Sequence, residues 1–223
     1  MNLDQTAILS FHRWMHAKFR ATKTGTLVVE YLGKEFVVHK NVFWPGDDSK
    51  PLVENYVVHP GEEVLDLCTR AGPIAVFSAY KGAGSVVAVD RNPAAVENAK
   101  ANAERHGYSH IIEVRESDMF SALEQDRKFD VITMNPPFLE YALDDIVSNS
   151  TWDAELHVHK EFFAHAHDHL KPHGRSYIAQ ASFGALEEMK QMARAAGYAI
   201  REIGKYQRPY TQIIFYAFEL QLR

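Results

Sequence analysis

Short apolar runs alternate with longer amphipathic stretches from about residue 58 onward. The apolar runs, which are typical of strands buried in a parallel sheet, occupy 64–68, 85–90, 110–115, 129–134 and 176–181. The amphipathic stretches, which have the spacing of helices, occupy 73–81, 92–106, 154–170 and 185–196. Strands that alternate with helices in this way predict a parallel sheet with helices on its faces.

The pattern changes near the end of the sequence. Residues 198–205 and 212–222 are two further strand candidates, and only a loop around Pro209 separates them. Because such a loop is too short for a parallel crossover, we expect the last strand to be antiparallel. The prediction is therefore an α/β, Rossmann-like fold with a mostly parallel seven-stranded sheet and an antiparallel last strand.

The first 57 residues have a different character. Apolar residues three and four positions apart, from Ile8 through Phe11 and Met15 to Phe19, predict a short helix. Two runs rich in β-branched and aromatic residues, 26–31 and 35–39, predict a hairpin. We therefore expect a helix and hairpin cap segment at 1–57 and one catalytic domain at 58–223.

Composition narrows the range of partners and compartments. A formal net charge of −5 argues against a broad basic face for nucleic acid, so a protein or small-molecule partner is favoured over RNA. The single cysteine cannot form an internal disulfide, and no apolar run reaches the length that crosses a bilayer. The default expectation is a cytoplasmic protein that does not bind a membrane.

Histidines are concentrated in the stretch 157–169, where His165 and His169 are four residues apart, as a metal-binding pair on a helix would be. No cysteine or obvious carboxylate completes a ligand set there. We expect the aromatic residues Phe162 and Phe163 to face the core with the histidines at the rim, and no metal site.

In an open α/β sheet, ligands bind at the carboxyl ends of the strands, where the strand order reverses. Asp90 ends the second strand of the sheet, where its carboxylate can accept hydrogen bonds from two ribose hydroxyls or cap the next helix. After the third strand, Asp118 offers a carboxylate to an adenine amino group, and Met119 offers an apolar surface to its ring. These positions predict a nucleoside-containing cofactor.

The strand 129–134 delivers Asn135, Pro136, Pro137 and Phe138 to the same edge of the sheet. The Asn135 side-chain oxygen and the Pro136 carbonyl can accept the two N–H bonds of an amide or amino group, and Phe138 can form a wall for a planar group. Such acceptors also favour the positive charge that develops on a nitrogen under alkylation. The alternative is an ordinary proline-rich turn after a strand.

These four residues, together with the stretch 42–49, resemble the small-domain methyltransferases. That family includes the release-factor glutamine methyltransferases and enzymes that methylate amino groups of ribosomal and transfer RNA bases. The resemblance implies S-adenosylmethionine as cofactor, N-methylation of an amide or amino nitrogen, and roles for Pro45 and Ser49 beside the methionine end of the cofactor. The acceptor is left open between a protein glutamine, a small molecule and a nucleobase.

The resemblance and the strand positions together define the expected site. Asn135, Pro136 and Phe138 are the expected catalytic residues, and Phe138 and Tyr177 are expected to contact the acceptor. The residues expected to bind the cofactor are Pro45, Ser49, Asp66, Cys68, Thr69, Arg70, Gly72, Asp90, Arg91, Asp118, Met119 and Asn135.

The loop after the first strand departs from the family pattern, because Cys68 and Arg70 stand where glycines are usual and only Gly72 is retained. Either the site binds the cofactor poorly, or Arg70 turns aside or pairs with the methionine carboxylate. Three other functions stay open: transfer of the aminobutyrate chain in place of the methyl group, a non-catalytic binding module, and a nicotinamide-dependent oxidoreductase.

Overall fold

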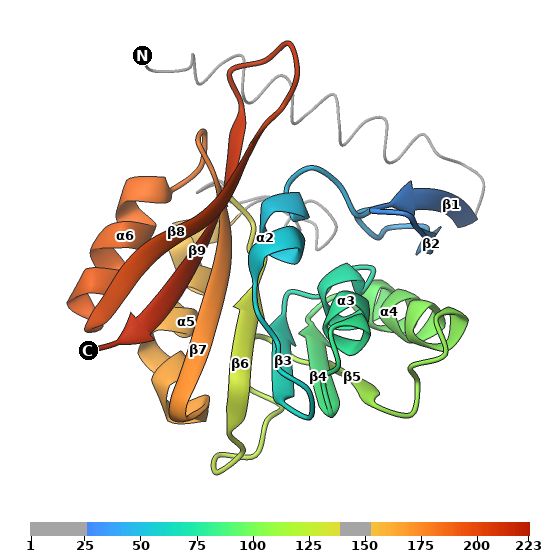
Figure 1. Ribbon diagram of the computed structural model, residues 1–223, viewed down its shortest axis with the longest axis horizontal. Helices are drawn as coiled ribbons and strands as arrows, with labels where there is room; N and C mark the ends of the chain where they lie inside the picture. The colour runs from blue at the N-terminus through green and yellow to red at the C-terminus, as the bar shows by residue number, and fades with distance from the viewer. Residues whose placement is uncertain (1–25, 139–152) are drawn as a thin grey trace.

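The computed structural model describes residues 26–138 and 153–223, in two sheets. The expected helix from Ile8 to Phe19 lies outside these residues. The main sheet has seven strands in the order β5-β4-β3-β6-β7-β9-β8 (Figure 1). Its strands are β3 (Glu63–Leu67), β4 (Ser85–Asp90), β5 (Ile112–Glu116), β6 (Phe129–Met134), β7 (Leu170–Ala181), β8 (Tyr198–Gln207) and β9 (Ile214–Leu222).

Strand directions confirm the predicted fold class. The strands from β3 to β7 pair in parallel, whereas β9 is antiparallel to both of its neighbours, β7 and β8. The strand order reverses at β3, the first strand of the sheet, which lies between β4 and β6. This reversal is the place where ligands bind in open α/β sheets.

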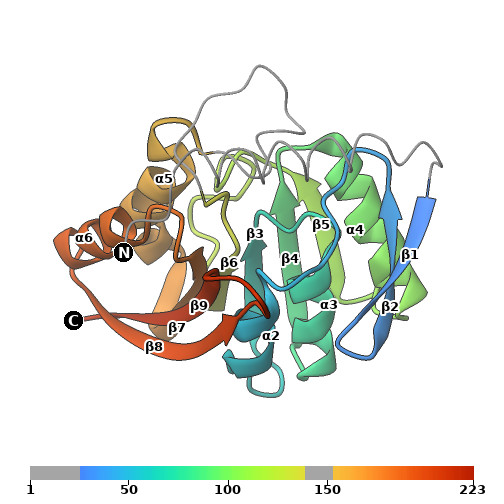
Figure 2. The ribbon, with the colours of Figure 1, turned by 90° about the horizontal axis from the view of Figure 1, so that it is seen from above.

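Helices cover both faces of the sheet (Figures 1 and 2). On one face lie α2 (Lys50–Asn55), α3 (Pro73–Tyr80) and α4 (Pro93–Arg105), and on the other lie α5 (His157–His165) and α6 (Leu186–Ala195). Proline occupies a first-turn position of α2, α3 and α4, where its missing N–H leaves no bond unmade. No helix of the described residues is long and apolar enough to cross a membrane.

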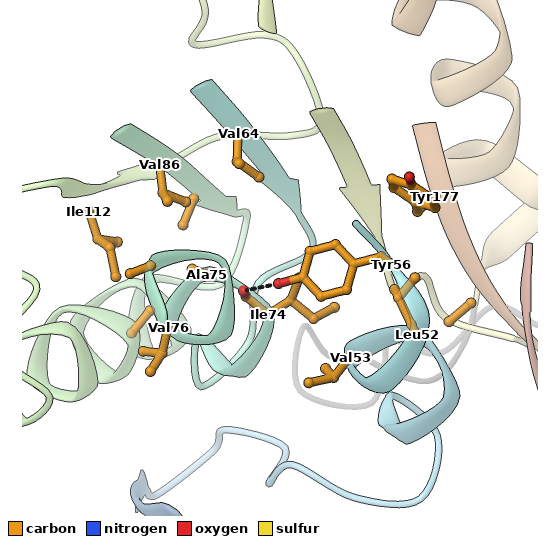
Figure 3. Packing of buried hydrophobic residues seen from close by; sticks show 14 of the residues in the cluster. Leu52, Val53, Tyr56, Val64, Ile74, Ala75, Val76, Val86, Ile112 and Tyr177 are labelled. Atoms are coloured by element: carbon orange, nitrogen blue, oxygen red, sulfur yellow. Dashed lines mark hydrogen bonds between the residues drawn. The ribbon is translucent and has the colours of Figure 1, made fainter. Parts of the chain in front are cut away.

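Alternation along the strands divides the core between the two faces. Val64, Val86 and Ile112 face α2 and α3, where Tyr56 donates a hydrogen bond from its hydroxyl to the Ile74 carbonyl at 3.2 Å (Figure 3). The neighbouring strand residues, such as Leu65 and Val87, pack with the other cluster, beneath α5 and α6. Burial of each such side chain contributes about 1.5–3 kcal/mol to the stability of the fold. The parallel sheet is therefore a stable support for the loops at its edge.

The structure differs from the predicted secondary structure in two regions, 154–176 and 50–55. The helix expected over 154–170 is a shorter α5 between 3₁₀ turns, η2 (Ala154–Leu156) and η3 (Ala166–His169), and β7 begins at Leu170. Glu155 and Leu156 have positive φ angles of 54° and 55°, which a continuous α-helix does not allow. The short helix α2 was not predicted, because its six residues are fewer than two turns.

The N-terminal hairpin consists of β1 (Thr26–Tyr31) and β2 (Lys34–His39) and is fixed to α4 by asparagine side chains. Asn102 accepts a hydrogen bond from the Val37 N–H at 2.8 Å, and Asn98 accepts one from the His39 N–H at 2.9 Å. Both amides also donate to the Val37 carbonyl at 2.8 Å. Side chains of α4 thus satisfy hydrogen-bonding groups of the β2 backbone, as a neighbouring strand would. These bonds also fix the position of the chain just before residues 42–49.

Candidate functional site

Three strands of the main sheet end at the same level. Leu67 at the end of β3 pairs with Met134 of β6 on one side and with Val89 of β4 on the other. The next residues, Cys68 and Asn135, therefore leave the sheet side by side, with Asp90 beside Cys68. After the roles expected of them, we call residues 68–72 the cofactor loop and residues 135–138 the acceptor loop.

A pocket opens above these strand ends. Six residues predicted to bind the cofactor line it, namely Cys68, Arg70, Asp90, Arg91, Asp118 and Met119. Pro137 of the acceptor loop also lines it. The strand-end argument therefore located the residues that share one cavity.

The opposite wall of the pocket was not predicted. It comes from Asp153 and Ala154, which precede α5, and from His157 and Val158, which begin it. His157 reaches across the rim, with its Nε2 3.3 Å from an Asp118 carboxylate oxygen. No local sequence pattern indicates that the start of this helix folds back over the strand ends.

The Asp90 carboxylate is held by backbone donors on both oxygens. The N–H of Arg70 donates to Oδ2 at 2.8 Å, and the N–H of Asn92 donates to Oδ1 at 2.9 Å. Burial raises the pKa of Asp90, and these two N–H groups oppose that rise. The cap of α4 is Asn92, whose side chain accepts from the Ala94 N–H, so helix capping does not explain Asp90.

The cofactor loop has an unusual backbone. Cys68, Arg70 and Gly72 all have positive φ angles, of 59°, 53° and 81°. Glycine adopts this conformation freely, whereas an L-residue there costs roughly 1–3 kcal/mol. A side chain at Gly72 would also lie 3.1 Å from the Cβ of Ala99 on α4, so this glycine permits close packing of the loop on a helix.

Asp66 lies beneath the cofactor loop, fully buried at the end of β3, and does not line the pocket. Its two oxygens accept hydrogen bonds from the hydroxyls of Thr69 at 2.7 Å and Thr133 at 2.9 Å. Burial raises the pKa of Asp66 to about 7. The structure places Asp66 and Thr69 as supports that tie the cofactor loop to β6.

The Arg70 side chain lines the pocket and is held by Asp48 and Phe43. Its Nη1 donates to Oδ2 of Asp48 at 2.7 Å, and its guanidinium lies over the Phe43 ring, 5.1 Å from the centroid. Asp48 is buried and was absent from the predicted site. Its position in the 42–49 motif was the only signal in the sequence that could have identified it.

Asn135 also contacts Asp48. Its Nδ2 donates to the same carboxylate oxygen at 3.0 Å. Its Oδ1 is buried and has no hydrogen-bond partner in the described structure. An unmatched buried acceptor costs about 1–3 kcal/mol, so the arrangement suits a group that brings its own N–H.

Phe138 ends the acceptor loop within an aromatic cluster. Its ring centroid lies 6.1 Å from those of both Phe183 and Phe215, and its carbonyl accepts from the Ala185 N–H at 2.9 Å. A methyl group at Gly184 would lie 2.4 Å from that carbonyl oxygen. The position of Phe138 is therefore fixed by the turn after β7 and by β9.

Three more of the predicted site residues, Tyr177, Ser49 and Pro45, do not line the pocket. Tyr177 is 2% exposed and packs edge-on against Tyr56 beneath α2, so it belongs to the core and not to the acceptor side. The Ser49 hydroxyl is bonded to the Tyr31 hydroxyl at 2.8 Å and to the Gly46 carbonyl at 3.2 Å. Pro45 is buried near it and does not line the pocket. In this motif Asp48 is the residue that reaches the site.

The histidines of 157–169 do not all lie at the rim, because His159 and His169 are buried. His165 lies 3.7 Å from Glu161, whereas His169 stacks on Phe120 and lies 2.8 Å from the Arg127 carbonyl. Across residues 26–138 and 153–223, no three histidine, cysteine, aspartate or glutamate side chains form a group that could hold a metal ion.

Comparison with known proteins identifies a family whose model covers the residues of the site. A family model described as methyltransferase small domain matches residues 35–206. A Methanocaldococcus jannaschii protein assigned as a protein N5-glutamine methyltransferase is 29% identical over 194 residues, which cover 84% of this chain and 96% of the relative. A release factor glutamine methyltransferase of Koribacter versatilis is 34% identical over 181 residues, which cover 74% of this chain and 64% of the relative.

Solved structures agree on the fold. A T. thermophilus 16S rRNA methyltransferase, solved in complex with AdoMet and guanosine, superposes with a TM-score of 0.62 at 21% identity. The match covers 89% of this chain and 50% of that chain. The match to the family model extends from the hairpin into β8 and includes the cofactor loop and the acceptor loop. The chain therefore belongs to the methyltransferase small-domain family and is an S-adenosylmethionine-dependent methyltransferase.

Proposed function

We propose that this enzyme methylates a planar amide nitrogen, that of a protein glutamine side chain, at the acceptor loop. The observation that carries the proposal is the unpaired Oδ1 of Asn135, which is buried beside a pocket lined by Asp90 and Asp118. An acceptor amide can donate one N–H to this oxygen and the other to the carbonyl of Pro136. Phe138 then forms the wall against the planar group.

The residues of the pocket fit S-adenosylmethionine. We assign the ribose hydroxyls to Asp90, because backbone donors already hold its carboxylate and it lines the pocket. We assign the adenine to Asp118 and Met119, and the methionine end to the side of Cys68 and Arg70. Cys68 and Arg70 adopt positive φ angles of 59° and 53°, so the loop keeps a glycine-like backbone at the positions where glycines are missing.

The residues of the site act by orientation and electrostatics. When bound, S-adenosylmethionine supplies a methyl group on a cationic sulfur: the nitrogen forms the new N–C bond, the C–S electron pair stays on sulfur, and one nitrogen proton leaves to solvent. The two N–H acceptors hold the amide so that its lone pair can be directed at the methyl group. They also stabilise the positive charge that builds up on the nitrogen, and no strong base is needed.

The choice of acceptor rests on two supports. The relative that this chain matches over 96% of its length carries a name for protein glutamine N5-methylation, and the relative from K. versatilis is named for release-factor glutamine. The net charge of −5 is also unfavourable for binding to a polyanion such as RNA. A release factor is therefore the first acceptor to test, and a ribosomal RNA fragment is the comparison.

The test is transfer of a labelled methyl group from S-adenosylmethionine to a bacterial release factor, with the Asn135→Ala variant beside the wild type. We expect Asn135→Ala to lower kcat by about a hundredfold or more, because an oriented polar contact to the transition state is lost. Affinity for S-adenosylhomocysteine, measured by calorimetry, should change by less than about threefold.

Asn55→Ala is the matched control. This asparagine is exposed at the end of α2, where its amide donates to the Pro51 carbonyl of the same helix. Its loss should leave turnover and cofactor affinity unchanged. Equal losses of turnover and cofactor affinity in Asn135→Ala would show that Asn135 has a structural role and not a catalytic one. Methylation of RNA but not of the release factor would overturn the proposed acceptor.

A further inference from the structure

One carboxylate oxygen joins the two loops of the site. Oδ2 of Asp48 accepts a hydrogen bond from Arg70 at 2.7 Å and from the Asn135 amide at 3.0 Å. Asp48 and Asn135 are 8% and 4% exposed, so little water competes for these bonds. The cofactor loop and the acceptor loop therefore share a single buried acceptor.

This contact decides which end of the Asn135 amide faces the acceptor. The oxygen and the nitrogen of an asparagine amide have nearly the same shape, so packing alone does not fix their positions. An ionised carboxylate accepts hydrogen bonds only, which means that only Nδ2 of Asn135 can face Asp48. Oδ1 is consequently directed to the other side, where it has no partner.

Arg70 supplies the countercharge. A carboxylate buried to this degree needs an opposite charge with good geometry, and the guanidinium of Arg70 lies 2.7 Å away, held against the Phe43 ring. This accounts for an arginine in a loop whose backbone favours glycine. Arg70 and Asn135 thus bind the same oxygen of Asp48, with the guanidinium as the ion-pair partner of the carboxylate that orients Asn135.

We propose that Asp48 is a positioning residue that locks the Asn135 amide with Oδ1 toward the acceptor N–H, and that Arg70 is its countercharge. The proposal rests on the proposed function for its kinetic consequence only. The orientation of the amide is a property of the protein alone and can be measured without any acceptor.

The kinetic test uses Asp48→Leu, which keeps similar bulk and removes the acceptor. With a release factor as substrate, we expect kcat to fall at least about tenfold while affinity for S-adenosylhomocysteine changes by less than about threefold. Added to Asn135→Ala, the same substitution should lower kcat by less than about twofold further, because the residue that it orients is already gone. A full additional tenfold loss in that background would show that Asp48 does not act through Asn135.

Asp47→Asn is the matched control. Asp47 is the neighbouring carboxylate and lies 3.5 Å from Arg208 with a side chain 39% exposed. Its neutralisation removes the same charge from the same segment and should leave kcat within about twofold of wild type. An equal fall in kcat in Asp47→Asn and Asp48→Leu would show a general effect of charge and would contradict a positioning role for Asp48.

The second measurement does not depend on activity. In protein labelled with ¹⁵N-asparagine, the Asn135 side-chain signal is assigned by its absence in Asn135→Ala. We expect this signal to shift in Asp48→Leu and to stay in place in Asp47→Asn, because only the first loses the carboxylate acceptor. An unchanged signal in Asp48→Leu overturns the proposal, even if the release factor proves not to be a substrate.

Asp48→Asn serves if Asp48→Leu does not fold. Its shape is native, but its amide can present either end to Asn135, so the lock is lost and the ion pair with Arg70 is removed. The same two measurements apply. We again expect the Asn135 side-chain signal to shift, and we expect kcat to fall at least about fivefold. Wild-type values for both readouts in a folded Asp48→Asn variant would refute the proposal.

Discussion

A buried hydrogen-bond chain that begins at Asp153, in the wall of the pocket, gives a direct test of how the site is held together. Nδ1 of His159 on α5 lies 2.6 Å from the carboxylate of Asp153, and both side chains are 1% exposed or less. Gln180 on β7 accepts the Ala181 N–H with its Oε1, which directs its Nε2 to His159 Nε2 at 3.1 Å. Nε2 is therefore an acceptor, and the proton on Nδ1 points to Asp153.

The magnitude for His159→Leu follows from the groups left behind. The Asp153 carboxylate loses the hydrogen bond from His159, and a hydrogen bond to a charged acceptor contributes about 1.5–3 kcal/mol. Asp153 keeps the bond from the Val158 N–H at 2.8 Å. The amide of Gln180 is left as an unpaired buried donor, which costs about 1–3 kcal/mol. The expected loss in the free energy of unfolding is about 3–5 kcal/mol, or roughly 6–20 °C in Tm for a domain of this size.

Urea denaturation followed by circular dichroism at pH 7 measures this loss. His165→Leu is the control, because His165 lies on the same helix with its side chain 50% exposed, a 3.7 Å contact to Glu161 and an edge contact to the Phe120 ring. That change should alter stability by less than about 0.5 kcal/mol. A loss below about 1 kcal/mol in His159→Leu would refute the reasoning. A combined Asp153→Asn and His159→Leu variant should recover part of the loss, because the buried charge is removed with its donor.

Three further substitutions address other parts of the site. Burial raises the pKa of Asp66 from 3.8 to about 7, so the folded protein keeps a proton that the unfolded chain releases. Wild type should therefore lose stability relative to Asp66→Asn as pH rises from about 4 to 7, by at most about 4 kcal/mol in urea denaturation, and a constant difference would contradict this. Asp90→Ala should weaken binding of S-adenosylhomocysteine about a hundredfold or more in calorimetry, through loss of charged hydrogen bonds to ribose, and a change under threefold would reject that role. Gly184→Ala places a methyl group 2.4 Å from the Phe138 carbonyl oxygen; it should lower the free energy of unfolding by about 1–3 kcal/mol in urea, and unchanged stability would show that the turn adapts.

Much of the fold could be predicted because its signals are local. Apolar strands separated by amphipathic helices indicated the parallel part, and the short loop around Pro209 indicated the antiparallel strand; both predictions are confirmed. The family inferred from the acceptor loop and the 42–49 stretch is confirmed by the match over residues 35–206. Membership of that family decides against a nicotinamide-dependent oxidoreductase.

Parts of the site depend on contacts that no local pattern encodes. Asp48 meets Asn135 across 87 positions of sequence, and Asp153 reaches the pocket by the path of the chain before α5. Tyr177 was misplaced because alternation shows that a strand residue faces one side but not which side faces the ligand. Strand ends are predictable because every parallel strand delivers its last residue to the same edge, whereas what folds over that edge is set by tertiary packing.

The place of β9 in the sheet affects the order in which the two halves of the site can assemble. β9 follows β8 in the sequence but lies between β7 and β8, and it carries Phe215 against Phe138. The strands from β3 to β6, whose ends carry Asp90 and the other residues that we assign to the cofactor, can pair once they have left the ribosome. Phe215 is translated later, so a nascent chain stalled before residue 214 would carry the residues that we assign to the cofactor but would lack the ring that packs against Phe138.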